Sequence, residues 1–110
     1  MENSADPVWM IYVPCPNADF ALRLSRTLVE EQLVACANVL APMTSIYVWE
    51  KKLHEESEVL VIAKSLKSLW PRLQARVKDL HPYETPAILA YAAEATSPDF
   101  ESWLRFSTRH

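Results

Sequence analysis

The 110-residue chain contains no glycine, although it contains eight prolines. Glycine is the residue that adopts positive backbone φ angles without steric cost, so other residues must build every turn of this chain. Two classes of nucleotide site are also excluded, because P-loops and dinucleotide-binding fingerprints require glycine where the backbone approaches the ligand. The sequence therefore predicts neither a phosphate-binding loop nor a Rossmann-type cofactor site.

Other common signals are missing as well. The chain has only two cysteines, Cys15 and Cys36, and no C-x-x-C or H-E-x-x-H motif that would indicate zinc. The eleven Lys and Arg residues are scattered and the net charge is −3, which gives no basic surface for nucleic acid or an anionic membrane. Apolar runs fall far short of the ~20 residues of a spanning helix, and the opening residues, MENSADP, do not resemble a secretion signal. We expect a cytoplasmic protein with free thiols.

The order of apolar patterns predicts one α+β domain over residues 1–110, with residues 1–7 as a flexible tail. Ser68 is expected to cap the second helix and Ser97 the last one. The expected elements are a strand at 8–13, a helix from an Asn17 cap to about 32, a bent strand at 35–53, a turn at 51–56, a strand at 57–66, a helix ending before Pro82, a strand at 85–93 and a C-terminal helix. This β-α-β-β-α-β order with a final helix is typical of a ferredoxin-like fold, with an antiparallel sheet and the two crossover helices on one face.

The stretch from 43 to 66 is predicted to be a long β-hairpin. Side chains alternate along its first arm, so that Tyr47 and Trp49 share one face while Ile46 and Val48 share the other. Each arm of about ten residues would extend ~34 Å, well beyond the ~13 Å radius of gyration of a domain this size. Because both faces carry large apolar groups, we expect the hairpin to project from the domain and to be covered by another subunit.

Several blocks, in the same order, resemble the CutA family of divalent-cation tolerance proteins, from about Trp9 to Phe106. These blocks are VPCPN at 13–17, LVEEQLVACANVL at 28–40, TSIYVWE at 44–50, SEVLVIAKS at 57–65 and HPYETP at 81–86. The resemblance implies a ferredoxin-like subunit and a tight homotrimer in which the hairpin arms pair between neighbours. It also implies a link to tolerance of copper and other divalent metals, with no established reaction.

The chain departs from the family pattern in two places. Many relatives have glycine where this chain has Met43 and Lys51, so these two turns must either have a different backbone geometry or bear some strain. In some bacterial relatives, copper binding is assigned to a cysteine on the first strand and to Cys/His groups near the end of the second helix. Of those positions, the resemblance carries only His81 over to this sequence as a metal ligand.

Two residues are candidates for metal binding, and each also has a structural interpretation. His81, held before Pro82, could ligate copper or zinc, or its ring could hydrogen-bond to a backbone carbonyl. Cys36 could be a soft metal ligand, or a small core residue.

A second group of residues could line a cleft between subunits. Tyr47, Trp49 and Glu50 lie on one arm of the hairpin, where aromatic residues can equally serve packing. Lys64 and Tyr83 could bring an ammonium group and a phenol to the same place, depending on assembly.

Three functional hypotheses follow. The first is a non-enzymatic homotrimer that binds Cu²⁺, another divalent cation or a small ligand weakly in clefts between its subunits, and that takes part in metal tolerance. The second is a PII-like signal-transduction adaptor without a dedicated metal site. The third is an enzyme that uses Cys15 as nucleophile, for which His81 is the only remaining candidate base.

Overall fold

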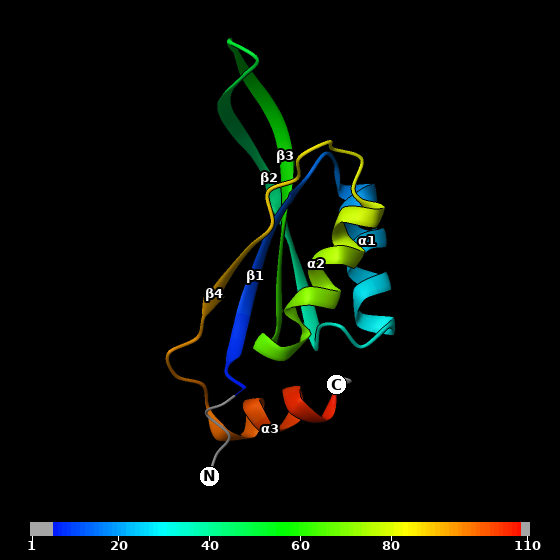
Figure 1. Ribbon diagram of the computed structural model, residues 1–110, viewed down its shortest axis with the longest axis vertical. Coiled ribbons are helices and arrows are strands. Elements are labelled where there is room, and N and C mark those ends of the chain that lie inside the picture. The colour runs from blue at the N-terminus through cyan, green and yellow to red at the C-terminus, as the bar shows by residue number, and fades with distance from the viewer. Residues whose placement is uncertain (1–5, 109–110) are drawn as a thin grey trace.

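The computed structural model describes residues 6–108, which form a four-stranded sheet and three α-helices. The elements are β1 (Val8–Cys15), α1 (Ala18–Glu30), β2 (Cys36–Trp49), β3 (Lys52–Leu66), a 3₁₀ turn (Lys67–Leu69), α2 (Trp70–Leu80), β4 (Leu89–Ala92) and α3 (Pro98–Phe106). The strand order is β2-β3-β1-β4 with antiparallel neighbours, and α1 and α2 lie on one side of the sheet (Figure 1). This arrangement confirms the predicted ferredoxin-like fold with an added C-terminal helix.

The main core lies between the sheet and helices α1 and α2. Alternate residues of β1, including Ile11 and Val13, point to this side together with Val61 of β3, and all three are almost completely buried. Helix α1 begins as predicted, because the Asn17 side chain accepts a hydrogen bond of 2.8 Å from the Phe20 N–H. The opposite face of the sheet carries the intervening residues and is not covered by α1 or α2, while α3 packs against its end, where Leu104 contacts Val8 and Leu66.

Helix α1 ends in a Schellman motif that is built without glycine. The Leu33 N–H donates to the Leu28 carbonyl and the Gln32 N–H donates to the Val29 carbonyl, which is the bonding pattern of that motif. Gln32 has a φ of 61°, the left-handed conformation for which helices usually select glycine at this position. Gln32 therefore occupies a position in this motif where glycine is the usual residue.

Two predicted boundaries are wrong. Ser68 does not cap α2: it lies in the 3₁₀ turn, and its N–H and hydroxyl both donate to the Asp6 carboxylate at 2.9 Å. Helix α2 starts at Trp70, with Pro71 tolerated in the first turn as expected. Strand β4 covers only 89–92 instead of 85–93, because the preceding residues form the loop that leaves α2.

The last helix starts where it was predicted to start, but its first turn is bonded differently. Ser97 occupies the cap position of α3 without a side-chain cap bond, while the Thr96 hydroxyl donates to Glu101 at 2.7 Å. Arg105 of the same helix donates to the Asp6 carbonyl, and the Pro7 carbonyl accepts from the Lys67 N–H. Within the predicted tail 1–7, residues 1–5 lie outside the described part, and these bonds fix residues 6 and 7 against the domain.

The long hairpin of β2 and β3 projects from one end of the molecule, whose extents are 50 × 25 × 24 Å (Figure 1). Its turn is the pair Glu50–Lys51, with φ values of 53° and 68°, and β3 begins at Lys52. The predicted turn at 51–56 is therefore wrong. Two left-handed central residues are characteristic of a type I′ turn, which matches the twist of the flanking strands and is usually built from Asn-Gly. The charged segment after Lys51 resembles a loop in composition, but it pairs as a strand.

Large apolar side chains of the hairpin remain exposed in the single chain. Val48 and Leu53 face each other across the two arms and are 66% and 70% exposed, respectively. Ile46, Tyr47 and Trp49 of β2 are also exposed. Within residues 6–108, no helix is long and apolar enough to cross a membrane. The exposed hairpin is thus the main apolar surface of the described chain that the fold leaves uncovered.

Candidate functional site

A hollow of about 520 Å³ lies at the base of the hairpin, on the sheet face opposite α1 and α2. Four aromatic side chains line it: Tyr12 from β1, Tyr47 and Trp49 from β2, and Tyr83 from the loop after α2. Three carboxylates, those of Glu56, Glu58 and Glu84, line it too. None of the lining residues in the described range 6–108 is Lys or Arg. The hollow is therefore aromatic in its walls and negative in its charge.

Glu58 is the most buried carboxylate of this site, with 7% of its surface exposed. The Tyr83 hydroxyl donates to its Oε2 atom at 2.5 Å. Burial raises the pKa of the Tyr83 phenol, and the hydrogen bond to the Glu58 carboxylate and its negative charge raise it further. The phenol consequently stays protonated at neutral pH and acts as a fixed hydrogen-bond donor to Glu58.

His81 lies behind this pair and is 6% exposed. Its Nε2 atom is 2.9 Å from the Pro14 carbonyl, and its Nδ1 atom accepts from the Tyr83 N–H at 3.3 Å. Because a carbonyl can only accept, Nε2 carries the proton, and the ring is the neutral tautomer that uses both nitrogens. Phe20 and Tyr83 pack against the ring with centroid distances of 5.1 Å and 4.5 Å. This geometry fits the structural interpretation of His81, which holds Pro14 and Tyr83 at the wall of the hollow.

The proposed metal ligands do not come together in this chain. Both ring nitrogens of His81 are occupied by protein hydrogen bonds, so neither is offered to a metal. Cys36 is half-buried and lies opposite Lys64 in the sheet, away from the hollow. Among residues 6–108, there is no group of three or more His, Cys, Asp or Glu side chains placed to hold a metal ion.

Of the predicted cleft residues, Tyr47, Trp49 and Tyr83 line the hollow. Glu50 does not, because it occupies the hairpin turn. Lys64 lies opposite Met10 in the sheet, and its Nζ donates to Asn38. Within one subunit, the predicted meeting of Lys64 and Tyr83 therefore does not occur.

Among the aromatic and acidic residues of the hollow, the sequence reasoning missed Tyr12, Glu56 and Glu58. Glu56 and Glu58 had a usable signal, because alternation places both on one face of β3. Tyr12 lies on the same face of the sheet, opposite α1 and α2, through its antiparallel pairing with Ile62. Glu84 lies in an irregular loop whose path no local pattern predicts.

Cys15 has none of the properties of a reactive thiol. Its side chain is completely buried, and burial followed by the charge of Glu58 raises its pKa to about 12. The thiolate form that acts as a nucleophile is therefore scarce at neutral pH. The position of Cys15 in the core argues against the third hypothesis, in which it is the nucleophile of an enzyme.

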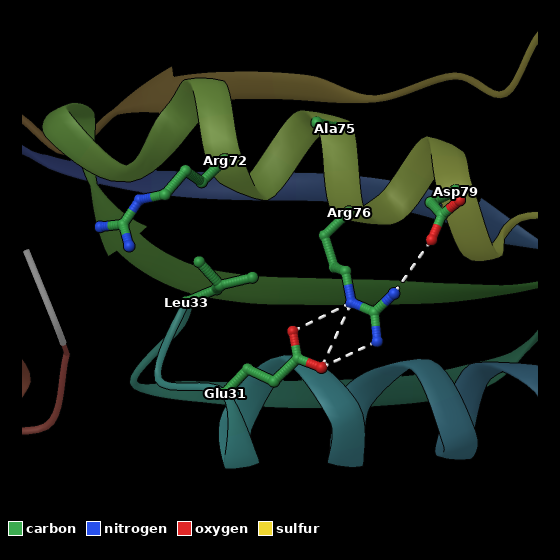
Figure 2. A pocket seen from close by; sticks show the side chains of 6 residues that line it. All are labelled: Glu31, Leu33, Arg72, Ala75, Arg76 and Asp79. Atoms are coloured by element: carbon green, nitrogen blue, oxygen red, sulfur yellow. Dashed lines mark hydrogen bonds and ion pairs between the residues drawn. The ribbon is translucent and has the colours of Figure 1, made fainter.

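A second hollow, of about 580 Å³, lies between α1 and α2 (Figure 2). Figure 2 shows Arg76 of α2 spanning it to Glu31 at the end of α1. The Arg76 Nε and Nη2 atoms donate to the two Glu31 oxygens at 2.9 and 2.8 Å, and Nη1 donates to Asp79 at 3.0 Å. Arg76 thus joins the two helices through Glu31 and is held on its own helix by Asp79, and we assign this hollow a structural role.

This ion pair predicts a pH-dependent stability. Hydrogen bonding from Arg76 and its positive charge lower the pKa of Glu31 below its ordinary value of 4.5. A lowered folded-state pKa contributes stability that is present above about 4.5 and is lost as the pH falls through the lower, folded-state pKa. We expect Glu31→Gln to destabilise the protein at pH 7, and expect the difference from wild type to shrink as the pH falls below about 4.5. Urea unfolding at pH 7 and at an acidic pH below that value measures this difference, and Glu30→Gln on the same helix is the control. A difference that stays constant between the two pH values would contradict the assignment.

Comparison with known proteins places these features in a family. Residues 9–107 match the family of CutA1 divalent ion tolerance proteins. The CutA protein of Mus musculus is 40% identical over 93 residues, which cover 84% of this chain and 52% of the mouse protein. The divalent-cation tolerance protein CutA of Thermus thermophilus is 35% identical over 99 residues, covering 90% of this chain and 96% of that protein.

Solved structures agree with this assignment. The crystal structure of CutA1 from Oryza sativa has a TM-score of 0.91 and 34% identity, and the match covers 94% of both chains. The chain spans about half the length of its mammalian relatives and nearly the whole length of the Thermus one. The sequence match over 9–107 and the shared fold together establish that this chain belongs to the CutA1 divalent ion tolerance protein family.

Proposed function

We propose that the chain acts as a non-enzymatic homotrimer in divalent-metal tolerance and binds cations or small ligands in clefts between its subunits. The observation that carries this proposal is the hollow at the base of the hairpin, because its three carboxylates attract positive charge and no Lys or Arg of residues 6–108 lines it. The name of the Thermus relative, a divalent-cation tolerance protein, agrees with a cationic ligand.

The homotrimer is supported by the hairpin. Val48 and Leu53 form an exposed apolar pair on one face near its tip, and Tyr47 and Trp49 are exposed on the other face, where they line the hollow. Exposed apolar surfaces of this kind usually mark an interface. A neighbouring copy that covers the hairpin would also close the outer side of the hollow, and would make it a cleft between subunits.

Metal binding in this cleft would be weak. The carboxylates of Glu56, Glu58 and Glu84 are oxygen donors, which suit hard divalent cations better than copper. Glu58 is already bonded to Tyr83, so one of its oxygens is partly satisfied. His81 supports the cleft through Pro14 and Tyr83 and is not proposed as a ligand.

A second candidate function is a PII-like signal-transduction adaptor that responds to a small organic effector. The observation in its favour is the aromatic lining of the hollow, which provides more ring surface than a metal site uses. Under this alternative the chain has no dedicated metal site.

Calorimetric titration of Zn²⁺ and Cu²⁺ into the purified protein tests the metal proposal. We expect dissociation constants on the order of 10⁻⁴ M or weaker, as for oxygen sites with few fixed ligands. Glu58→Gln should weaken binding, whereas Glu55→Gln, which removes a carboxylate of β3 outside the hollow, should not. Nanomolar binding of one ion per subunit would contradict a weak site and would indicate a dedicated metal carrier.

A further inference from the structure

We propose that the hollow at the base of the hairpin is a binding site for an organic monocation, an alkylammonium group held against aromatic rings and neutralised by Glu58. The inference rests on the proposed function, because it names the class of small ligand that the same site would take. The inference goes beyond the proposed function because it assigns a particular cation, one whose charge is carried by a nitrogen atom surrounded by methyl or methylene groups.

Aromatic side chains form much of the wall of the hollow. Tyr12, Tyr47, Trp49 and Tyr83 approach the hollow from two strands and one loop, so rings are presented from more than one direction. The faces of aromatic rings are negative, and they attract cations within about 6 Å of the ring centre, with tryptophan the most effective. Rings collected around a space are the arrangement by which proteins recognise alkylated ammonium groups.

The position of the Tyr47 ring is also fixed. His54 stacks on it with a centroid distance of 5.2 Å and an interplanar angle of 10°. Tyr83 is held from behind by His81, as described above. Two of the four rings are therefore positioned before any ligand arrives, which reduces the entropy lost on binding.

Carboxylates supply negative charge to the same hollow. Glu58 is buried, and Tyr83 fixes one of its oxygens at 2.5 Å, so its charge is placed at the wall in a poorly solvated environment. Glu56 lies two residues away on the same face of β3, and Glu84 adds a third carboxylate from the loop. A cation in this space meets negative charge and negative ring faces, and no Lys or Arg among residues 6–108 lines the hollow to oppose it.

The same features disfavour a compact, strongly hydrated metal ion as the best ligand. Such an ion needs several oxygen or nitrogen donors that converge at close range, and no group of three acidic, His or Cys side chains in residues 6–108 converges in this way. An alkylammonium ion has a weaker hydration shell and an apolar surface that rings can cover. The lining of the hollow, with its carboxylates and aromatic rings, suits a ligand that combines one positive charge with an apolar surface.

The test is calorimetric titration of choline chloride into the full-length protein in its native assembly, alongside its neutral isostere 3,3-dimethylbutan-1-ol. We expect choline to bind at one molecule per subunit, and expect the neutral alcohol to bind at least about tenfold more weakly, because it forfeits both the carboxylate and the ring attraction. Equal binding of the two compounds, or no binding of choline at millimolar concentration, would overturn the proposal.

Two variants locate the site. Glu58→Gln keeps the shape and an acceptor for Tyr83 but removes the charge, and Tyr47→Leu removes one ring at an exposed position. Each should weaken choline binding by about tenfold, while Glu55→Gln should leave it unchanged. Choline affinity unchanged in both Glu58→Gln and Tyr47→Leu would also overturn the assignment.

The mass of the assembly, measured on the same samples, separates this inference from the proposed function. A trimer that does not bind choline refutes the inference alone. A monomer that does bind it supports the inference and refutes the inter-subunit cleft.

Discussion

Light scattering of the purified protein at micromolar concentration should give three times the subunit mass of 12.6 kDa, and replacing Val48 and Leu53 together by glutamate should give the mass of one subunit. These two residues face each other near the hairpin tip and are among the most exposed apolar side chains in the described chain. Burying a Val or Leu side chain contributes about 1.5–3 kcal/mol, and a buried unpaired carboxylate costs several more. Two such changes in every subunit are enough to prevent association.

The matched control replaces Leu22 and Val29 of α1 by glutamate. These are also exposed apolar residues, but they lie on α1, away from the projecting tip of the hairpin. We expect this variant to keep the wild-type mass. A wild-type protein that scatters as a 12.6 kDa particle, or a double hairpin variant that keeps the wild-type mass, would refute the proposed interface.

Replacing His81 by alanine should lower the free energy of unfolding by about 2–4 kcal/mol. The change leaves the buried Pro14 carbonyl without its donor, which costs ~1–3 kcal/mol, and removes a ring packed between Phe20 and Tyr83, worth ~0.5–1.5 kcal/mol. Urea unfolding at one fixed subunit concentration measures the loss, because assembly couples stability to concentration.

A second substitution distinguishes the hydrogen bond from simple loss of volume. In His81→Gln, the side-chain amide can still donate to the Pro14 carbonyl, so part of the lost stability should return. An ordinary surface substitution changes the free energy of unfolding by no more than about 0.5 kcal/mol. If His81→Ala stays within that range of wild type, the contacts of His81 contribute little to stability.

Most of the fold could be predicted because its signals are local. Alternation identified the hairpin strands, and the Asn17 cap marked the start of α1. The failures occurred where another contact decided the outcome. Ser68 has the residue type of a helix cap, but its hydroxyl is used by Asp6, which is 62 residues away in the sequence.

The candidate site was only partly predictable for the same reason. Tyr47 and Trp49 were found because they alternate along one strand, which is a local signal. The role of His81 depends on the Pro14 carbonyl, 67 residues earlier, and that of Tyr83 depends on Glu58, 25 residues earlier. Such pairings follow from the way the strands and helices pack, so the spacing of residues along the chain does not predict them.

The glycine-free sequence also affects the unfolded ensemble, and residues 6–108 contain three left-handed positions at which this matters. A side chain at Gln32, Glu50 or Lys51 costs about 1–2 kcal/mol in the folded state, because Cβ crowds the backbone in this conformation. A chain with a side chain at every position also has fewer backbone states to lose when it folds, which favours the native protein by up to ~1 kcal/mol for each glycine avoided. These opposing effects make the three positions the places where evolution or engineering could introduce glycine at least cost, while elsewhere in its helices and strands the same change would loosen the chain.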